Sequence, residues 1–279
     1  MGEPFLGSEA VARGVLTRGQ LCTGYLRLFR DVYVNRDADV TAALRARAGW
    51  LWSGRRGVVA GFAAAALHGS NWVDRLTAVD LIHDNRHFQA GIRAHADRIE
   101  DDEIIVIGEI PLTSAARTAL DIGCWYSTTA AVAGIDALAR ATGIKAADVE
   151  LLAERYSRRR GIVQARKAIA LFDSGAQSPK ESWLRLVLIE AGLPRPQTQI
   201  PVLDELGSAI AYLDMGWEQL KVAVEYDGEQ HRVNRRQYTW DVRRLETIER
   251  LGWIVVRVLA SDRPADIIRR VRAARARRA

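Results

Sequence analysis

Two shortages narrow the function of this 279-residue chain: cysteine is rare, and no long apolar run is present. The two cysteines, Cys22 and Cys124, cannot form a four-cysteine metal site, and we expect them to be free thiols of a cytosolic protein. The longest apolar run, residues 58–67, is too short to span a bilayer. Residues 1–15 show no apolar core of a secretory signal. These absences favour a cytoplasmic protein that has no membrane partner.

Motifs of several common activities are missing as well. The sequence shows no internal repeat, no low-complexity tract and no glycine-rich nucleotide-binding motif. His83, His87 and His95 lie near one another, but neither cysteines nor acids accompany them at metal-ligand spacing. We expect these three histidines to lie on the surface or in loops.

The composition indicates a globular protein with an excess of positive charge. Hydrophobic residues make up 48% of the chain and charged residues 27%, and the mean hydropathy is -0.10, which is ordinary for globular domains. The net charge is +6 and the isoelectric point is near 9.6. A basic balance of this kind favours a polyanionic partner such as nucleic acid.

Residue patterns divide the chain into three parts with an α/β (α+β overall) fold. We expect a small domain at residues 1–75, a mixed α/β middle region at 76–173 and a further α/β domain at 178–279, with DSGAQS (173–178) as a linker. In the middle region we expect Thr113 to cap a helix on which Arg117 and Asp121 form a surface pair. Its other expected elements are strands at 77–82 and 103–108 and helices near 127–140, 146–156 and 162–172.

The most informative segment of the C-terminal domain is AYLDMGWEQLKVAVEYDGEQH, which has the pattern of a β-hairpin. A four-residue turn after Trp217 would place this tryptophan opposite Val222, and Asp214 opposite Glu225. Opposed residues have Cβ atoms about 5 Å apart, and two carboxylates at that separation repel unless a positive charge lies between them. A divalent cation such as Mg²⁺, which prefers oxygen ligands, would supply that charge.

Neighbouring residues fit a hydrolytic site. Asp227 follows Glu225 by two residues and so lies on the same face of the strand. His231 has a side chain that titrates near neutral pH and is a candidate general base. A metal-bound water with a base beside it can hydrolyse a phosphodiester. The alternative is that the acids simply face solvent, with their charge offset by Lys221 and Arg232.

These residues carry a resemblance to a known family. The run YLDMGWEQLKVAVEYDGEQHR, followed by YTWDVRRLETIERLGWIVVRV, resembles the small nuclease-like domain related to very-short-patch-repair endonucleases, in the PD-(D/E)xK superfamily. The resemblance covers residues 178–279 and implies a restriction-endonuclease-like mixed sheet flanked by helices. It implies Mg²⁺ or Mn²⁺ bound by Asp214 and Glu225, with Asp227 where the superfamily usually has lysine. The very-short-patch branch also lacks this lysine and relies on histidine. The other implied catalytic residues are His231, Asp241 and Glu181.

The helices on either side of the hairpin also have local explanations. Ser178-Pro179-Lys180-Glu181 is a capping box with proline at the first helical position, so Glu181 caps its own helix, instead of or besides a catalytic role. A second helix is expected at 237–251, and its spacing places Asp241 either on the buried side or exposed beside it. A buried carboxylate needs a partner, and His231 or Arg244 would serve. Residues 253–258 predict an interior strand.

The N-terminal region carries a second resemblance. We expect a short helix at 16–22 capped by Thr17, a strand at 32–34, a helix at 41–52 with Arg45 and Arg47 facing outward, and a helix at 61–68. From RGVLTRGQL through VYV to AALHG, this order resembles the winged-helix N-terminal domain of abortive-infection type IV antitoxins (AbiEi). A full recognition helix is missing, because only residues 23–30 are available, about two helical turns. Arg27 and Arg30 either contact phosphates there or are solvated.

Three functions follow from these patterns. The first is a metal-dependent DNA endonuclease, acting on DNA rather than RNA, with Arg232, Arg235 and Arg236 contacting the nucleic acid. The second is a DNA-binding regulator or antitoxin-like protein that keeps a nuclease fold without catalysis. The third is a module that binds a protein partner, and the oligomeric state stays open. The basic clusters RYSRRR (155–160) and IIRRVRAARARR (267–278) either bind phosphates or form solvated faces.

Overall fold

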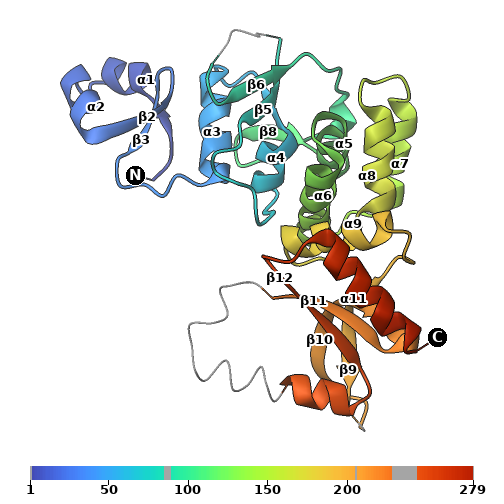
Figure 1. The fold of residues 1–279 in the computed structure, drawn as a ribbon. Coiled ribbons are helices and arrows are strands. Elements are labelled where there is room, and N and C mark those ends of the chain that lie inside the picture. Colours follow the sequence, from blue (N-terminus) through green and yellow to red (C-terminus); the bar gives the residue numbers. More distant parts are fainter. Residues whose placement is uncertain (1, 85–88, 205, 228–243, 279) are drawn as a thin grey trace. The chain divides into compact units, whose positions relative to one another are not determined.

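The chain folds into two compact units, Met1–Ser174 and Gly175–Ala279 (Figure 1). The linker predicted at residues 173–178 spans the division between them. The fold is mixed α/β, as the sequence predicts, and three sheets are present in the described part of the chain. The structure is a computed structural model that describes residues 2–84, 89–204, 206–227 and 244–278.

The first unit begins with a small antiparallel sheet in the strand order β1-β3-β2, accompanied by two short helices (Figure 1). Thr17 caps α2 as predicted: its hydroxyl accepts a hydrogen bond from Gln20 N at 3.2 Å, and Gln20 Oε1 accepts one from Thr17 N at 2.8 Å. These elements are β1 (Phe5–Leu6), α1 (Gly7–Ala12), α2 (Arg18–Gly24), β2 (Tyr25–Phe29) and β3 (Val32–Asn35).

The segment expected to form two helical turns at residues 23–30 is strand β2, so that prediction is wrong. Gly24 ends α2, and Asp31 adopts a φ of 61°, which turns the chain back on itself. β2 then pairs with β3, whose Val32 and Val34 are fully buried. Burial of this hairpin against α3 outweighs the helical preference of its leucines.

A five-stranded mixed sheet forms the middle of the first unit, in the order β6-β5-β4-β8-β7. β4 pairs antiparallel with β5 and parallel with β8, so this sheet joins strands from both sides of the domain boundary predicted at residue 75. Its strands are β4 (Val58–Ala60), β5 (Val79–Ile82), β6 (Ile92–His95), β7 (Ile104–Ile107) and β8 (Ile110–Thr113).

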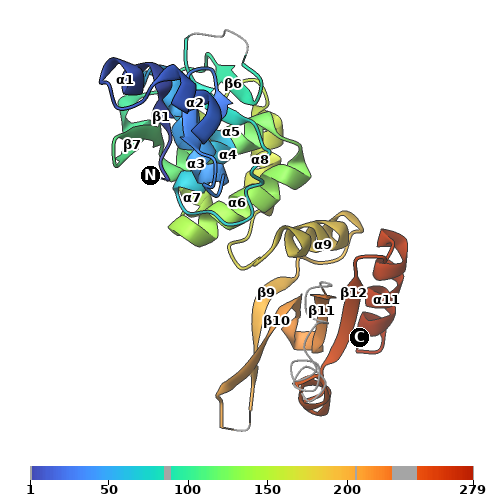
Figure 2. The ribbon, with the colours of Figure 1, turned by 90° about the vertical axis from the view of Figure 1, so that its left-hand side faces the viewer.

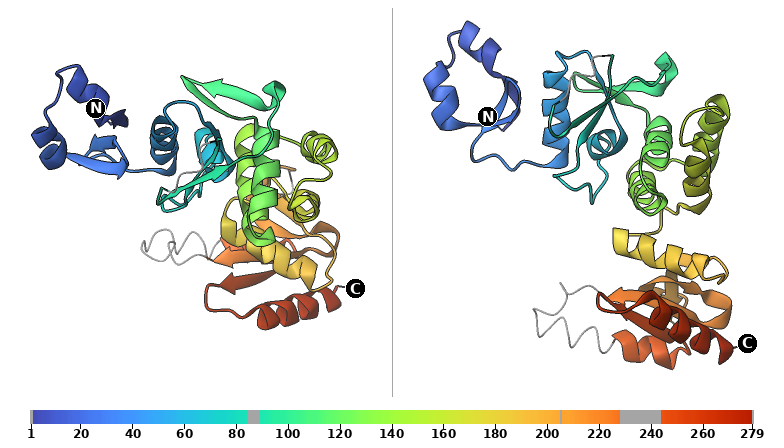
Figure 3. Two further views of the ribbon diagram at one scale, coloured as in Figure 1. Left: turned by 90° about the horizontal axis from the view of Figure 1, so that it is seen from above. Right: turned by 45° about the horizontal axis from the view of Figure 1, so that its top comes forward.

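Helices complete the first unit, and Figure 3 shows α5 to α8 grouped beside the five-stranded sheet. Their positions agree with the sequence pattern, except that Ser114 caps α5 in place of Thr113. None of the helices in the described ranges is long and apolar enough to cross a membrane. The helices are α3 (Ala42–Trp52), α4 (Gly61–Leu67), α5 (Ala115–Trp125), α6 (Thr128–Thr142), α7 (Ala146–Arg155) and α8 (Ile162–Leu171), with a 3-10 turn η1 (Asp101–Glu103) before β7.

Two arginines of the first unit lie deeper than the sequence pattern predicts. Arg45 was expected to face outward, but its guanidinium lies 5.4 Å from the centre of the Phe29 ring, and burial lowers its pKa. Arg117 and Asp121, expected as a surface pair, are both fully buried. The pairing itself was predicted correctly, but helical spacing does not reveal what covers the pair.

Of the clustered histidines, His83 lies in the loop after β5, one of the two expected positions, whereas His95 lies on strand β6. The side chain of His83 is 3% exposed, and its Nδ1 lies 2.8 Å from Asp84 Oδ1. His95 Nε2 lies 2.9 Å from Oδ1 of the fully buried Asp80. Pairing of the buried strand β5 with β6 brings these groups together. His87 lies outside the described residues.

The second unit is a four-stranded mixed sheet in the order β12-β11-β10-β9, in which β11 and β12 are parallel (Figure 2). Val222 and Val224 pack in one core with residues of α9 and α11, whereas Ala223 packs in another with Ile248 of the helical segment 244–250. Both faces of the sheet are therefore covered. The elements are α9 (Pro179–Glu190), β9 (Gln197–Leu203), β10 (Ala209–Trp217), a 3-10 turn η2 (Glu218–Leu220), β11 (Val222–Asp227), β12 (Ile254–Leu259) and α11 (Pro264–Ala276).

Candidate functional site

The β10–β11 hairpin has the turn and the register that the sequence predicts. Trp217 lies opposite Val222, and the next two residue pairs keep the same register. The turn consists of η2 and Lys221, whose φ of 48° redirects the chain into β11. The paired register ends at Met215 and Val224, and Asp214 and Glu225 are the residues that follow on the two strands.

Asp214 and Glu225 lie close together on neighbouring strands. Asp214 Oδ2 accepts a hydrogen bond from the backbone N–H of Tyr226 at 2.9 Å, so this carboxylate reaches across to β11. Burial raises the pKa of Glu225 above its ordinary value, the guanidinium of Arg244 opposes that rise, and the charge of Asp214 adds to it. The hairpin therefore sets two acids against each other in a partly buried place.

Arginines neutralise two of the acids of this face. Arg244 Nη2 donates to Glu225 Oε1 at 3.0 Å. Arg257 Nη2 donates to Asp227 Oδ2 at 2.5 Å. Lys221, one of the alternative partners that the sequence suggests, instead donates its Nζ to a main-chain carbonyl oxygen at 3.0 Å. The described contacts therefore include no ion pair of Lys221 with these acids, and the solvent-facing alternative stays a prediction.

The sequence contains a signal for Arg257 that lies outside the acidic motif. β12 is otherwise a run of apolar residues, and a single arginine within such a run calls for a partner. The parallel pairing of β11 with β12 places Arg257 beside Glu225, and Asp227 lies two residues further along β11. Arg244 has no comparable signal, because its contact with Glu225 depends on how the segment 244–250 packs on the sheet.

Glu181 has the capping role that its position predicts. Its Oε2 accepts a hydrogen bond from Gln177 N at 2.8 Å, and its Oε1 accepts one from the Ser178 hydroxyl at 2.9 Å. In return Ser178 Oγ accepts from Glu181 N at 3.2 Å, and Pro179 occupies the first turn of the helix. These contacts account for the burial of the carboxylate at the start of α9. A catalytic role for Glu181 stays a prediction.

The remaining predicted site residues lie outside the described residues. These are the catalytic candidates His231 and Asp241 and the nucleic-acid candidates Arg232, Arg235 and Arg236, whose roles stay predictions. Within the ranges that the structure describes, no three His, Cys, Asp or Glu side chains are grouped so that they could hold a metal ion. Asp214 and Glu225 are thus the described part of the candidate metal site.

The N-terminal candidates Arg27 and Arg30 are exposed, but they belong to a strand and its turn and not to a helix. Arg27 lies opposite Tyr33 in the small sheet, and the backbone N–H of Arg30 donates to Gln89 Oε1 at 3.4 Å. Their contact with phosphates stays a prediction. Residues 23–35 are all described, and between α2 and β3 they form no helix that could read a major groove.

The C-terminal basic cluster is docked on its own unit. Arg272 Nη2 donates to the carbonyl oxygen of Ala191, at the end of α9, at 2.8 Å. The guanidinium of Arg275 lies 4.7 Å from the centre of the Trp217 ring. Cations are favourable near helix C-termini, and guanidinium groups are attracted to the indole face. α11 is therefore an ordered helix, and these two arginines help to hold it.

Comparison with known proteins gives two relatives from Mycobacterium tuberculosis. They are "Uncharacterized protein MT2308" of strain CDC 1551 / Oshkosh and "Uncharacterized protein Rv2248" of strain ATCC 25618 / H37Rv, each 27% identical over 241 residues. Each alignment covers 86% of this chain and 87% of the relative. No family model and no solved structure matches the chain. Because the aligned length exceeds that of the first unit, the similarity extends into both units.

Proposed function

We propose that the second unit hydrolyses phosphodiester bonds of a nucleic acid, DNA rather than RNA, with Mg²⁺ or Mn²⁺ as its metal. The observation that carries this proposal is the placement of Asp214 and Glu225 on neighbouring antiparallel strands, with Asp214 bonded to the backbone of β11. The resemblance of residues 178–279 to very-short-patch-repair-like nucleases supports the same assignment. A cytoplasmic location is part of the proposal.

The two carboxylates fit a hard divalent cation. Mg²⁺ prefers oxygen ligands and is commonly held by one or two carboxylates together with water and substrate phosphate oxygens. Asp214 and Glu225 would hold the ion. Its charge would offset the repulsion that, together with burial, raises the pKa of Glu225. When bound, such an ion lowers the pKa of a coordinated water and stabilises the charge that develops on the phosphate.

The two arginines take part in this proposal as exchangeable partners. Arg244 bonds to Glu225 in the free protein, yet its side chain is 24% exposed and so within reach of a ligand. Arg257 bonds to Asp227 with a side chain that is 52% exposed. A guanidinium binds phosphate as well as carboxylate. Both arginines can therefore bind substrate phosphates when a cation displaces them from the acids. His231 would accept the proton of the attacking water.

A second candidate function is nucleic-acid binding without hydrolysis, as a regulator or antitoxin-like protein. The observation that favours it is the same pair of ion pairs, Glu225 with Arg244 and Asp227 with Arg257. If these contacts persist, Glu225 and Asp227 are each offset by an arginine, and neither needs an ion. Binding would then depend on salt, because phosphate contacts release counterions, and would not depend on Mg²⁺.

Calorimetric titration with Mg²⁺ separates the two candidates. The proteins to compare are the wild type, Glu225→Gln and Asp266→Asn, because Asp266 is an exposed carboxylate of α11 that pairs with Arg269 at 2.7 Å. We expect the wild type and Asp266→Asn to bind Mg²⁺ equally and Glu225→Gln to bind it about tenfold more weakly or not at all. Absence of binding by the wild type, or equal binding by all three proteins, contradicts the metal site.

A further inference from the structure

An arginine-lined hollow opens beside the turn that joins α7 to α8 in the first unit. Its volume is about 290 Å³, and its lining includes Arg98, Arg155, Arg158, Arg159 and Asp97. Most of these residues come from the basic cluster RYSRRR at the end of α7. The candidate metal site in the second unit shares no residue with it.

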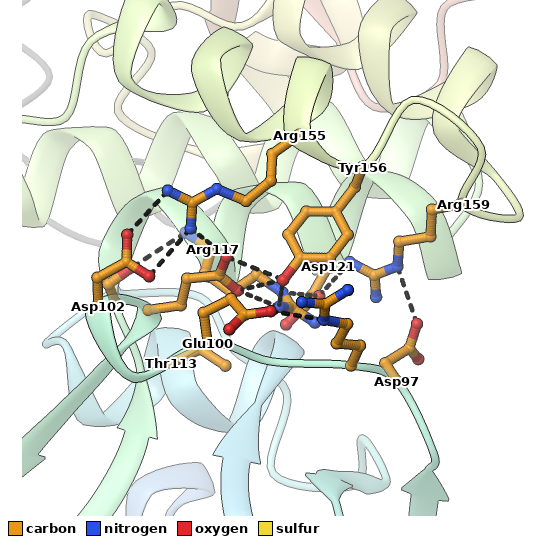
Figure 4. Close-up of polar contacts among 12 residues, drawn as sticks. Asp97, Glu100, Asp102, Thr113, Arg117, Asp121, Arg155, Tyr156 and Arg159 are labelled. Atoms are coloured by element: carbon orange, nitrogen blue, oxygen red, sulfur yellow. Dashed lines mark hydrogen bonds and ion pairs between the residues drawn. The ribbon is translucent and has the colours of Figure 1, made fainter.

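The wall of this hollow is fixed by a buried network of ion pairs (Figure 4). Arg117 is fully buried, donates its Nε to Asp121 Oδ1 at 2.8 Å, and forms a second ion pair with Glu103. The Tyr156 hydroxyl donates to Glu103 at 2.9 Å. Burial disfavours the charged form of Arg117, but Asp121 and Glu103 outweigh it, so that the pKa of Arg117 lies above its ordinary value. Arginine at this position is therefore always charged.

Arg159 connects this network to the hollow and has a donor to spare. Its Nε lies 2.9 Å from Asp97 Oδ1, and its Nη1 lies 2.7 Å from Asp121 Oδ1. Its side chain is 7% exposed, and the guanidinium lies 5.2 Å from the centre of the Trp125 ring. All three guanidinium nitrogens, Nε, Nη1 and Nη2, are buried, and none of them makes a hydrogen bond of good geometry to a described residue. A buried donor without a partner is costly, and an acceptor in the hollow would satisfy it.

The other lining arginines differ in their ion pairs and in their exposure to solvent. Arg155 is anchored, with Nη2 at 2.9 Å from Asp102 Oδ2 and Nη1 at 2.7 Å from Glu103 Oε1. Arg98 is 81% exposed and pairs with Glu100 at 2.5 Å. Arg158 is exposed and forms no ion pair with any described residue. The hollow thus combines the anchored guanidinium groups of Arg155 and Arg159 with the exposed ones of Arg98 and Arg158.

We propose that this hollow binds a phosphate group, and that its source is the backbone of a nucleic acid. Planar guanidinium groups match phosphate oxygens, and several of them around one hollow favour an anion of more than one charge. The single lining carboxylate, Asp97, is itself occupied by Arg159. A free phosphate ester is the other source of the same chemistry, and the experiment distinguishes the two.

The test measures binding in EDTA, so that its outcome does not depend on hydrolysis by the second unit. A fluorescein-labelled duplex is titrated with the wild type, Arg158→Ala and Arg140→Ala, the last being an exposed arginine of α6 outside the hollow. We expect Arg158→Ala to weaken binding about tenfold and to lower the slope of log K against log salt by about 1. Arg140→Ala is expected to change neither quantity, although it removes the same charge.

Calorimetry with inorganic pyrophosphate supplies the second arm. If the wild type binds pyrophosphate, Arg158→Ala does not, and the duplex affinity is unchanged, the phosphate site stands and a small phosphate ester is its ligand. If Arg158→Ala and Arg140→Ala match the wild type in both titrations, or weaken both equally, the proposal is overturned. Equal midpoints of thermal unfolding in the three proteins establish that the substitutions leave the fold intact.

Discussion

Asp214 accepts a hydrogen bond from the backbone N–H of Tyr226 at 2.9 Å, across the β10–β11 hairpin. This bond turns the carboxylate toward the strand that carries Glu225, whose pKa is raised by burial and, in addition, by the charge of Asp214. Two acids held in this way need a positive charge beside them, and Arg244 supplies one in the free protein. The question that separates the two candidate functions is whether a metal ion displaces that arginine.

Replacing Arg244 by alanine is expected to have opposite effects on stability and on metal binding. The Glu225 carboxylate and the carbonyl oxygen of Tyr212 both lose a hydrogen bond from Arg244, which lowers the free energy of unfolding by about 1–3 kcal/mol. Without the guanidinium of Arg244, the negative charge of Glu225 is no longer offset, so Mg²⁺ binds more tightly. The bound ion then restores the free energy of unfolding that the substitution removed. Thermal unfolding with and without Mg²⁺ measures both effects.

The matched control for Arg244→Ala is Arg269→Ala, because Arg269 is 74% exposed and pairs with Asp266 on the surface of α11. Its loss is expected to change the free energy of unfolding by about 0–1 kcal/mol, with or without Mg²⁺. If Mg²⁺ stabilises Arg244→Ala no more than it stabilises this control, Arg244 and the ion do not compete for the same acids.

Replacing Arg117 by methionine is expected to destabilise the first unit strongly. The substitution removes one of the two arginines that each of the buried carboxylates Glu103 and Asp121 contacts, and breaking buried pairs in this way costs about 3–5 kcal/mol. Arg98→Met, at a position that is 81% exposed, is expected to cost about 0–1 kcal/mol. Urea unfolding followed by circular dichroism compares the two. Similar small losses for both variants would show that Arg117 forms a surface pair after all.

The two cysteines are expected to differ in reactivity. Burial is the main cause that raises the pKa of Cys124, to about 11, whereas Cys22 is exposed. A raised pKa keeps the thiol protonated, so at pH 8 only about one Cys124 in a thousand is the reactive thiolate. A chromogenic disulfide reagent should therefore titrate one fast thiol at pH 8, absent from Cys22→Ser, and a second one only as the pH approaches 11. Two equally fast thiols at pH 8 would contradict the burial of Cys124.

Local signals in the sequence predict the elements of the site well. The strand formers at 222–226 and the four-residue turn before them fix the hairpin register, so Trp217 lies opposite Val222. The capping residues Thr17 and Ser178 mark the first residues of α2 and α9 correctly. In each case the interacting groups lie within a few residues of one another, so that composition and spacing are enough to identify them.

Contacts between distant residues are the part that the sequence does not reveal. Arg257 follows Asp227 by 30 residues, and its choice of partner depends on the parallel pairing of β11 with β12. The prediction of a helix at residues 23–30 is wrong for a related reason, because pairing with β3 overrides the local preference for a helix there. β4 likewise joins a sheet whose other strands follow residue 75. Tertiary packing decides each of these outcomes.

The central claim, metal-dependent hydrolysis by Asp214 and Glu225, is tested most directly by nucleic-acid cleavage. Labelled single-stranded, duplex and mismatched DNA and RNA are incubated with Mg²⁺ or Mn²⁺ and the wild type, Asp214→Asn or Asp266→Asn. The amide oxygen of asparagine can still accept the hydrogen bond from Tyr226, so Asp214→Asn keeps the hairpin contact. We predict cleavage of DNA by the wild type and Asp266→Asn and a loss of at least about a hundredfold in Asp214→Asn. No cleavage of any substrate by the wild type, or undiminished cleavage by Asp214→Asn, would contradict the claim.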